Sequence, residues 1–73
     1  MKLDAVMPII FGRPFRRAEW VDDGDEFQWV VYVPKSNDFD WADDAGKPSG
    51  NFFGDLADIF RDINIIADDW EIK

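Results

Sequence analysis

The sequence contains no cysteine and no histidine among its 73 residues. Disulfides are therefore excluded, and a zinc site of the usual kind lacks its ligands. The acidic segment 38–46 has the composition of a calcium loop, but Ala42 stands where an oxygen ligand belongs. Hydrolysis would depend on carboxylates alone, because neither serine has a histidine to act as its base. We expect a binding protein rather than an enzyme, with no cofactor and no metal.

The chain is also short, so that a single domain over residues 1–73 can bury only a small core. Because neither a disulfide nor zinc can stabilise it, we expect oligomerisation to do so and predict a homodimer or homotetramer. Apolar residues at 47% and aromatic residues at 16% are too abundant for a disordered acidic tail. The composition therefore indicates a folded domain.

Positive charge is scarce, since 8 Lys and Arg face 16 Asp and Glu for a formal net charge of -8. This balance argues against duplex nucleic acid or an anionic membrane as a partner. The basic residues are concentrated at the start, where Lys2, Arg13, Arg16 and Arg17 are opposed by Asp4 alone. A basic region of this size suits a ligand with one or two phosphates better than a polymer.

Long apolar runs are missing as well. The run Val6–Phe11 is too short to span a bilayer, contains Pro8 and follows an acidic rather than a basic residue. We therefore expect neither a membrane anchor nor a targeting segment, and we predict a cytoplasmic protein.

Helical periodicity occurs near both ends of the chain. At the start it predicts a short amphipathic helix ending at Gly12, distorted by Pro8, with the apolar residues Leu3, Val6, Met7 and Ile10. Near the end it predicts a helix capped by Asp55, with the apolar residues Leu56, Ile59, Phe60 and Ile63.

Between these helices the sequence indicates β-structure. Two strands, Pro14–Val21 and Phe27–Val33, flank a hairpin connection in which Asp23-Gly24 supplies the turn. Residues 35–51 are rich in Ser, Asn, Asp, Gly and Pro and are predicted to form a long loop. Trp70–Ile72 is expected to form a short closing strand. We therefore predict an α+β fold, a small antiparallel β-sheet with one or two short helices.

Two segments concentrate the residues best suited to binding. Residues 11–21 (FGRPFRRAEWV) combine three arginines with a tryptophan, and residues 65–72 (IIADDWEI) supply a second tryptophan beside two aspartates. Guanidinium groups bind anions, and indole rings stack on flat groups. A ligand that is both anionic and flat would suit this combination.

The same segments carry a family resemblance. Residues 4–20 (DAVMPIIFGRPFRRAEW) resemble the amino-terminal signature of the phage Thoeris anti-defence 2 family, a short helix that closes with glycine and precedes a basic strand ending in tryptophan. Residues 65–72 resemble the closing block of that family. Together the two blocks cover about a third of the chain.

The resemblance implies a phage protein in the cytoplasm of the host bacterium that sequesters a cyclic ADP-ribose-type immune signal, or another cyclic nucleotide, without cleaving it. Members of the family are similar in forming tetramers with pockets where protomers meet. The residues that fit a ligand-binding role are Arg13, Arg16, Arg17, Trp20, Asp69 and Trp70. The tryptophans would stack on the base, the arginines would bind phosphate oxygens, and Asp69 would accept hydrogen bonds from the ribose or the adenine amine.

These residues also have structural interpretations. Trp20 and Trp70 could equally belong to the core, and Trp29 is expected there. Arg16 and Arg17 are adjacent on a predicted strand, so that at most one of them points into a given pocket.

A second functional class stays open, namely an acidic protein inhibitor or DNA mimic that blocks a host nucleic-acid-binding defence protein. The aspartates that would imitate phosphates are Asp22, Asp23, Asp25, Asp38, Asp40, Asp43 and Asp44. The affinity of a mimic for its partner should fall steeply with salt, whereas stacking on tryptophan should not.

Overall fold

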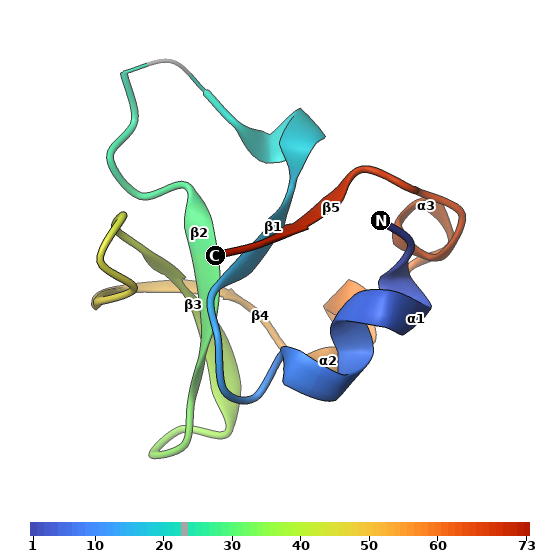
Figure 1. Cartoon of the computed structure of the whole chain (residues 1–73). Helices are drawn as coiled ribbons and strands as arrows, with labels where there is room; N and C mark the ends of the chain where they lie inside the picture. Colours follow the sequence, from blue (N-terminus) through green and yellow to red (C-terminus); the bar gives the residue numbers. More distant parts are fainter. Residues whose placement is uncertain (23) are drawn as a thin grey trace.

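The computed structural model describes residues 1–22 and 24–73. Over these residues the chain forms a five-stranded antiparallel sheet in the order β4-β3-β2-β1-β5, with short helices beside it (Figure 1). The strands are β1 (Phe15–Arg17), β2 (Trp29–Val33), β3 (Asp38–Ala42), β4 (Pro48–Gly54) and β5 (Trp70–Ile72). The helices are α1 (Leu3–Val6), α2 (Leu56–Ile59) and α3 (Asp62–Ile65), and the 3-10 turns are η1 (Met7–Ile9) and η2 (Ala18–Trp20). The predicted α+β class is confirmed.

The beginning and the end of the chain meet in this sheet. β1 pairs with β2, where Phe15 lies opposite Val30, and also with β5, where Arg17 lies opposite Trp70. The predicted closing strand Trp70–Ile72 is confirmed as β5. The two segments that carry the candidate binding residues therefore lie side by side.

The main core lies between one face of the sheet and the helices. Successive strand residues point to opposite faces, so that Phe15, Val30 and Phe39 share the face that packs against α1 and α2. The buried cluster comprises Leu3, Val6, Ile10, Phe15, Val30, Phe39, Ile59 and Trp70. A smaller cluster on the other face consists of Trp29, Val31 and Ala42, so the expectation that Trp29 is buried is confirmed.

The amino-terminal helix forms for a single turn. α1 ends at Val6, and the chain continues as the 3-10 turn η1, which holds Pro8 near its start. Proline has no N–H to donate, and its ring clashes with the preceding turn of an α-helix, which explains the change. Leu3, Val6 and Ile10 nevertheless lie in the core, as the periodicity predicted.

The first predicted strand is shorter than the sequence indicated. β1 ends at Arg17, and the backbone then turns into η2. Asp69 explains the turn, because its carbonyl accepts the N–H of Ala18 at 2.9 Å and its carboxylate accepts the N–H of Glu19 at 3.1 Å. β1 and β2 are antiparallel neighbours as predicted, but residues 18–28 connect them. Asp23 of the predicted turn lies outside the described residues.

The prediction of a long loop over residues 35–51 is wrong, because this region contains β3 and most of β4. Phe39 and Trp41 alternate with aspartates, which is the pattern of a strand with one apolar face. Phe39 is 1% exposed. The turn before β3 uses Asn37, whose φ of 57° lies in the left-handed region that asparagine tolerates. The abundance of turn-forming residues therefore led to a loop prediction where the chain forms the β2–β3 hairpin.

The predicted second helix begins where expected but breaks in two. Asp55 accepts the N–H of Ala57 at 2.9 Å, and Asp58 accepts the N–H of Asp55 at 2.9 Å, so that α2 has a capping box. The Asn64 side chain then donates to the carbonyl of Asp58 at 3.0 Å and satisfies a carbonyl that a longer helix would have used. The chain extends at Arg61 and restarts as α3.

This break changes the role of the apolar residues in the second helix. Ile59 is fully buried, but Leu56, Phe60 and Ile63 are 40%, 42% and 60% exposed. The helical periodicity therefore predicted a core position correctly at Ile59 alone. Among the helices of the described residues, none has the length and apolar character that crossing a bilayer requires.

Candidate functional site

Strand β1 sends its two arginines to opposite faces of the sheet. Arg17 shares the main-core face with Phe15 and is 8% exposed. Arg16 lies on the other face, with its guanidinium carbon 3.9 Å from the centroid of the Trp29 ring. The prediction that at most one of the pair points into a given pocket is confirmed.

Arg17 is held by a network of acceptors. Its Nε donates to Asp69 Oδ1 at 2.8 Å, and its terminal nitrogens reach Glu19 at 2.8 Å and the side-chain oxygen of Asn64 at 3.3 Å. A guanidinium with this set of partners has few donors left for a ligand. Arg17 therefore fixes η2 and α3 relative to β5.

This pairing shifts both protonation equilibria. The hydrogen bond from Arg17 is the largest cause that lowers the pKa of the Asp69 carboxyl, against the opposing effect of burial. The hydrogen bond to Asp69 likewise raises the pKa of Arg17. Each partner favours the charged form of the other, so the ion pair persists at neutral pH.

Trp20 stands at the end of η2 within a group of aromatic rings. Its centroid lies 6.0 Å from that of Trp41 and 5.2 Å from that of Phe53, and the Trp41 and Phe53 centroids are also 5.2 Å apart. Each of these three side chains is half-buried. They form an aromatic wall contributed by η2, β3 and β4.

Trp70 lies behind this wall, inside the core. It is 2% exposed, its ring packs edge-on against Trp20 at 5.3 Å, and its indole N–H donates to the carbonyl of Asn64 at 3.1 Å. A ring buried to this extent offers no face to a base. Trp70 therefore cannot stack on a ligand in this conformation. Its ring instead packs against Trp20 from the core side.

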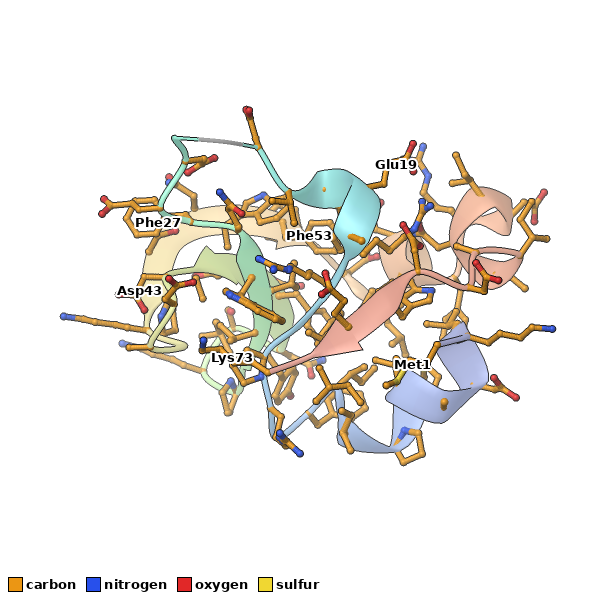
Figure 2. The ribbon with its side chains drawn as sticks, turned by 45° about the horizontal axis from the view of Figure 1, so that its top comes forward. Met1, Glu19, Phe27, Asp43, Phe53 and Lys73 are labelled. Atoms are coloured by element: carbon orange, nitrogen blue, oxygen red, sulfur yellow. The ribbon has the colours of Figure 1, made fainter. Side chains whose placement is uncertain are left out.

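A cleft of about 480 Å³ opens between the aromatic wall and the turn that joins α2 to α3. Its lining residues are Arg17, Glu19, Trp20, Trp41, Phe53, Asp58, Arg61, Ile63 and Asn64. Figure 2 shows the labelled Phe53 beside η2, with Glu19 on the side of η2 that faces α3. The volume falls within the range of small-molecule sites, which is about 300–1,000 Å³.

The charges of the cleft are unequally engaged. Glu19 is paired with Arg17, and Asp58 accepts the N–H of Asp55 in the capping box. Arg61 is exposed and forms no ion pair with the carboxylates of residues 1–22 and 24–73. Arg61 is therefore the cation best placed to meet an anion in the cleft.

The remaining candidate residues lie elsewhere. Arg16 donates to Glu71 at 3.2 Å, its cross-strand neighbour on β5, on the face opposite the cleft. Arg13 donates from its Nε to the backbone carbonyl of Lys73 at 3.0 Å. The structure brings Arg17, Trp20, Asp69 and Trp70 together, and it separates Arg13 and Arg16 from them.

Sequence reasoning missed Trp41, Phe53, Arg61 and Asn64 as cleft residues. The alternation of apolar and acidic residues over 38–42 could have placed Trp41 on a strand face. Arg61 and Asn64 gave no comparable signal, because their position depends on the break between α2 and α3.

The acidic segment 38–46, which has the composition of a calcium loop, forms β3 and a turn, in which Asp43 accepts the N–H groups of Ala45 and Lys47. Within the described part of the chain, no group of three or more carboxylates is placed to hold a metal ion.

Comparisons of the chain with protein-family models, with curated proteins and with solved structures give no match.

Proposed function

We propose that this protein binds a small anionic nucleotide in the cleft and sequesters it without cleaving it. The observation that carries the proposal is the aromatic wall of Trp20, Trp41 and Phe53 facing a cleft that also holds Arg61. Stacking of a base on an aromatic side chain is worth about 1–3 kcal/mol. A guanidinium adds charge-assisted hydrogen bonds to phosphate oxygens.

The resemblance to the phage Thoeris anti-defence 2 family supports a more specific proposal. The ligand is then a cyclic ADP-ribose-type immune signal, and the protein is a phage anti-defence sponge in the host bacterium. Such a ligand combines an adenine face with a pyrophosphate, which the wall and Arg61 would meet respectively. The cleft volume of about 480 Å³ is adequate for a ligand of this class.

The arginine assignments differ from those made on sequence alone. Arg61 takes the direct phosphate role in this proposal, because the donors of Arg17 are engaged by Asp69, Glu19 and Asn64. Arg17 contributes its positive field and positions η2, which carries Trp20. Binding requires no reacting side chain, so the bound nucleotide should be released intact.

Calorimetry and thermal shift with purified protein test the proposal. The panel contains cyclic ADP-ribose isomers, cyclic dinucleotides and cyclic trinucleotides. A specific ligand at 100-fold excess over its dissociation constant should stabilise the fold by about 2.7 kcal/mol. Chromatography of the ligand released by heating should show the unchanged nucleotide.

Arg61→Gln is the informative variant, and Lys35→Gln is its matched control, because Lys35 is exposed in the turn between β2 and β3. We expect Arg61→Gln to weaken binding and to flatten the dependence of affinity on salt, while Lys35→Gln binds like the native protein. A panel without any stabilising nucleotide would overturn the proposal. So would a hydrolysed ligand, or Arg61→Gln binding with native affinity and salt dependence.

A second candidate is an acidic inhibitor that mimics nucleic acid, as the excess of carboxylates suggests. Asp25, Glu26, Asp43 and Asp44 gather around a concave surface of about 420 Å³ near the ends of β2 and β3. A basic groove on a host defence protein is the partner that such a surface would suit. Steeply salt-dependent capture of a nucleic-acid-binding protein, abolished by Asp43→Asn with Asp44→Asn and unaffected by Arg61→Gln, would favour this function over the first.

A further inference from the structure

An apolar groove of about 390 Å³ lies on the helical side of the molecule. Leu3, Met7, Phe60 and Ile65 line it, and Lys2 and Asp4 stand at its rim. Figure 1 shows α1, α2 and α3 gathered on one side of the sheet. The groove shares no lining residue with the cleft.

The surface around this groove is strongly apolar. Phe60 and Ile65 are 42% and 50% exposed, Leu56 is 40% exposed and lies one helical turn before Phe60, and Ile66 is 81% exposed. We call these four residues the helical face. Apolar side chains gathered in this way on a surface are typical of an interaction site.

The charge distribution favours a second copy of the chain as the occupant. Two copies with a formal net charge of -8 repel each other over most of their surface. At the groove, Lys2 and Asp4 carry opposite charges, so that two copies repel each other less there than over the rest of the acidic surface. A two-fold axis would place Lys2 of each copy opposite Asp4 of the other, which is the self-complementarity that such an interface requires.

The shape of the helical face also favours a second copy of the chain. Ile66 projects almost fully into solvent and directly follows Ile65, which lines the groove. A protruding side chain next to a cavity on one face lets each copy insert its Ile66 into the groove of the other.

We propose that the helical face is the interface of a two-fold homodimer, in which Ile66 of each protomer occupies the groove of its partner and Lys2 pairs with Asp4 across the axis. This assigns a location to the oligomerisation expected from the short chain. It also accounts for the exposure of Leu56 and Phe60, which periodicity placed in the core.

Light scattering coupled to size-exclusion chromatography tests the interface. The native chain, 8.5 kDa as a single copy, should elute at twice that mass at micromolar concentration. Ile66→Glu places a charge in the apolar interface and should weaken association by at least about tenfold. Because Ile66 is 81% exposed, the variant should keep the native circular dichroism spectrum. Phe52→Glu is the matched control, since Phe52 is 62% exposed on β4, outside the helical face.

Charge reversal at the rim provides a specific second test. Lys2→Asp should weaken association because an acidic group then faces Asp4 of the partner, and the double variant Lys2→Asp with Asp4→Lys should restore it. Three results would overturn the proposal. They are a native protein of single-copy mass, an Ile66→Glu protein that associates like the native chain, and dissociation caused by Phe52→Glu instead. A native tetramer that Ile66→Glu reduces to a smaller species would support it.

Discussion

The Arg17 guanidinium and the Asp69 carboxylate are joined by a 2.8 Å hydrogen bond that ties β1 to the residue preceding β5. Because Arg17 is buried, loss of the carboxylate charge leaves its guanidinium poorly compensated. We predict that Asp69→Asn lowers the free energy of unfolding by about 1.5–3 kcal/mol, the range for hydrogen bonds to charged groups. Urea denaturation measures the change. Asp68→Asn alters the neighbouring exposed carboxylate by the same charge and should cost little; equal losses in the two variants would contradict the prediction.

The same pair predicts how stability depends on pH. The folded-state pKa of Asp69 is lowered, so its contribution is fully present above the unfolded-state pKa of about 3.9 and is lost as pH falls through the folded-state pKa. The stability difference between native protein and Asp69→Asn should therefore be constant from pH 5 to pH 7, on the order of the loss above, and should shrink below about pH 4. Urea midpoints measured across this range test the sign. A difference that widens in acid would contradict it.

Trp70 should act on stability rather than through direct ligand contact. Trp70→Phe keeps an aromatic ring in the core but leaves the Asn64 carbonyl without its 3.1 Å indole donor. The expected cost is about 1–3 kcal/mol, and Trp70→Ala should cost about 3–5 kcal/mol. Thermal denaturation measures both. Trp70→Phe protein that remains folded should bind nucleotide with near-native affinity, so a large loss of affinity without a loss of stability would restore the stacking role.

Arg16 was a candidate ligand-binding residue on sequence grounds, but it does not line the cleft. It stacks on Trp29 and pairs with Glu71 on the face opposite the cleft. Arg16→Gln should therefore leave nucleotide affinity unchanged and lower stability by about 0.5–2 kcal/mol through the lost cation–π contact. Calorimetry and urea denaturation of the same sample measure the two effects. Weakened binding at native stability would place the ligand on the Arg16 face.

The capping box of α2 gives a prediction about local structure. Asp55→Ala removes the acceptor for the N–H groups of Ala57 and Asp58 and should cost about 1 kcal/mol. Glu26→Ala is a suitable control, because Glu26 is exposed and lies far along the chain. Because α2 leads into Arg61, the same variant should also loosen the cleft, which amide hydrogen exchange at residues 56–65 would detect. Native exchange rates there would contradict this prediction.

The sequence determined the elements whose evidence is local. The α+β class, the start of the second helix at Asp55, the closing strand Trp70–Ile72 and the burial of Trp29 follow from residue type, capping chemistry and strand propensity. The sequence signals for these features come from residues a few positions apart or from a simple alternation. They can therefore be predicted without knowledge of the tertiary structure.

Tertiary structure decided the features that depend on residues far apart in the sequence. Asp69 ends β1 by accepting from Ala18 and Glu19 across about fifty positions, and so moves Trp20 from a strand to η2. Asn64, whose side-chain oxygen accepts from Arg17 across 47 positions, breaks the second helix, which exposes Phe60 and brings Arg61 to the cleft. Hydrogen-bond partners at such separations leave no periodic signal in the sequence. The residues that line the cleft therefore include only Arg17 and Trp20 from the sequence-based set. The other lining residues reach the cleft through tertiary packing, which the sequence does not reveal.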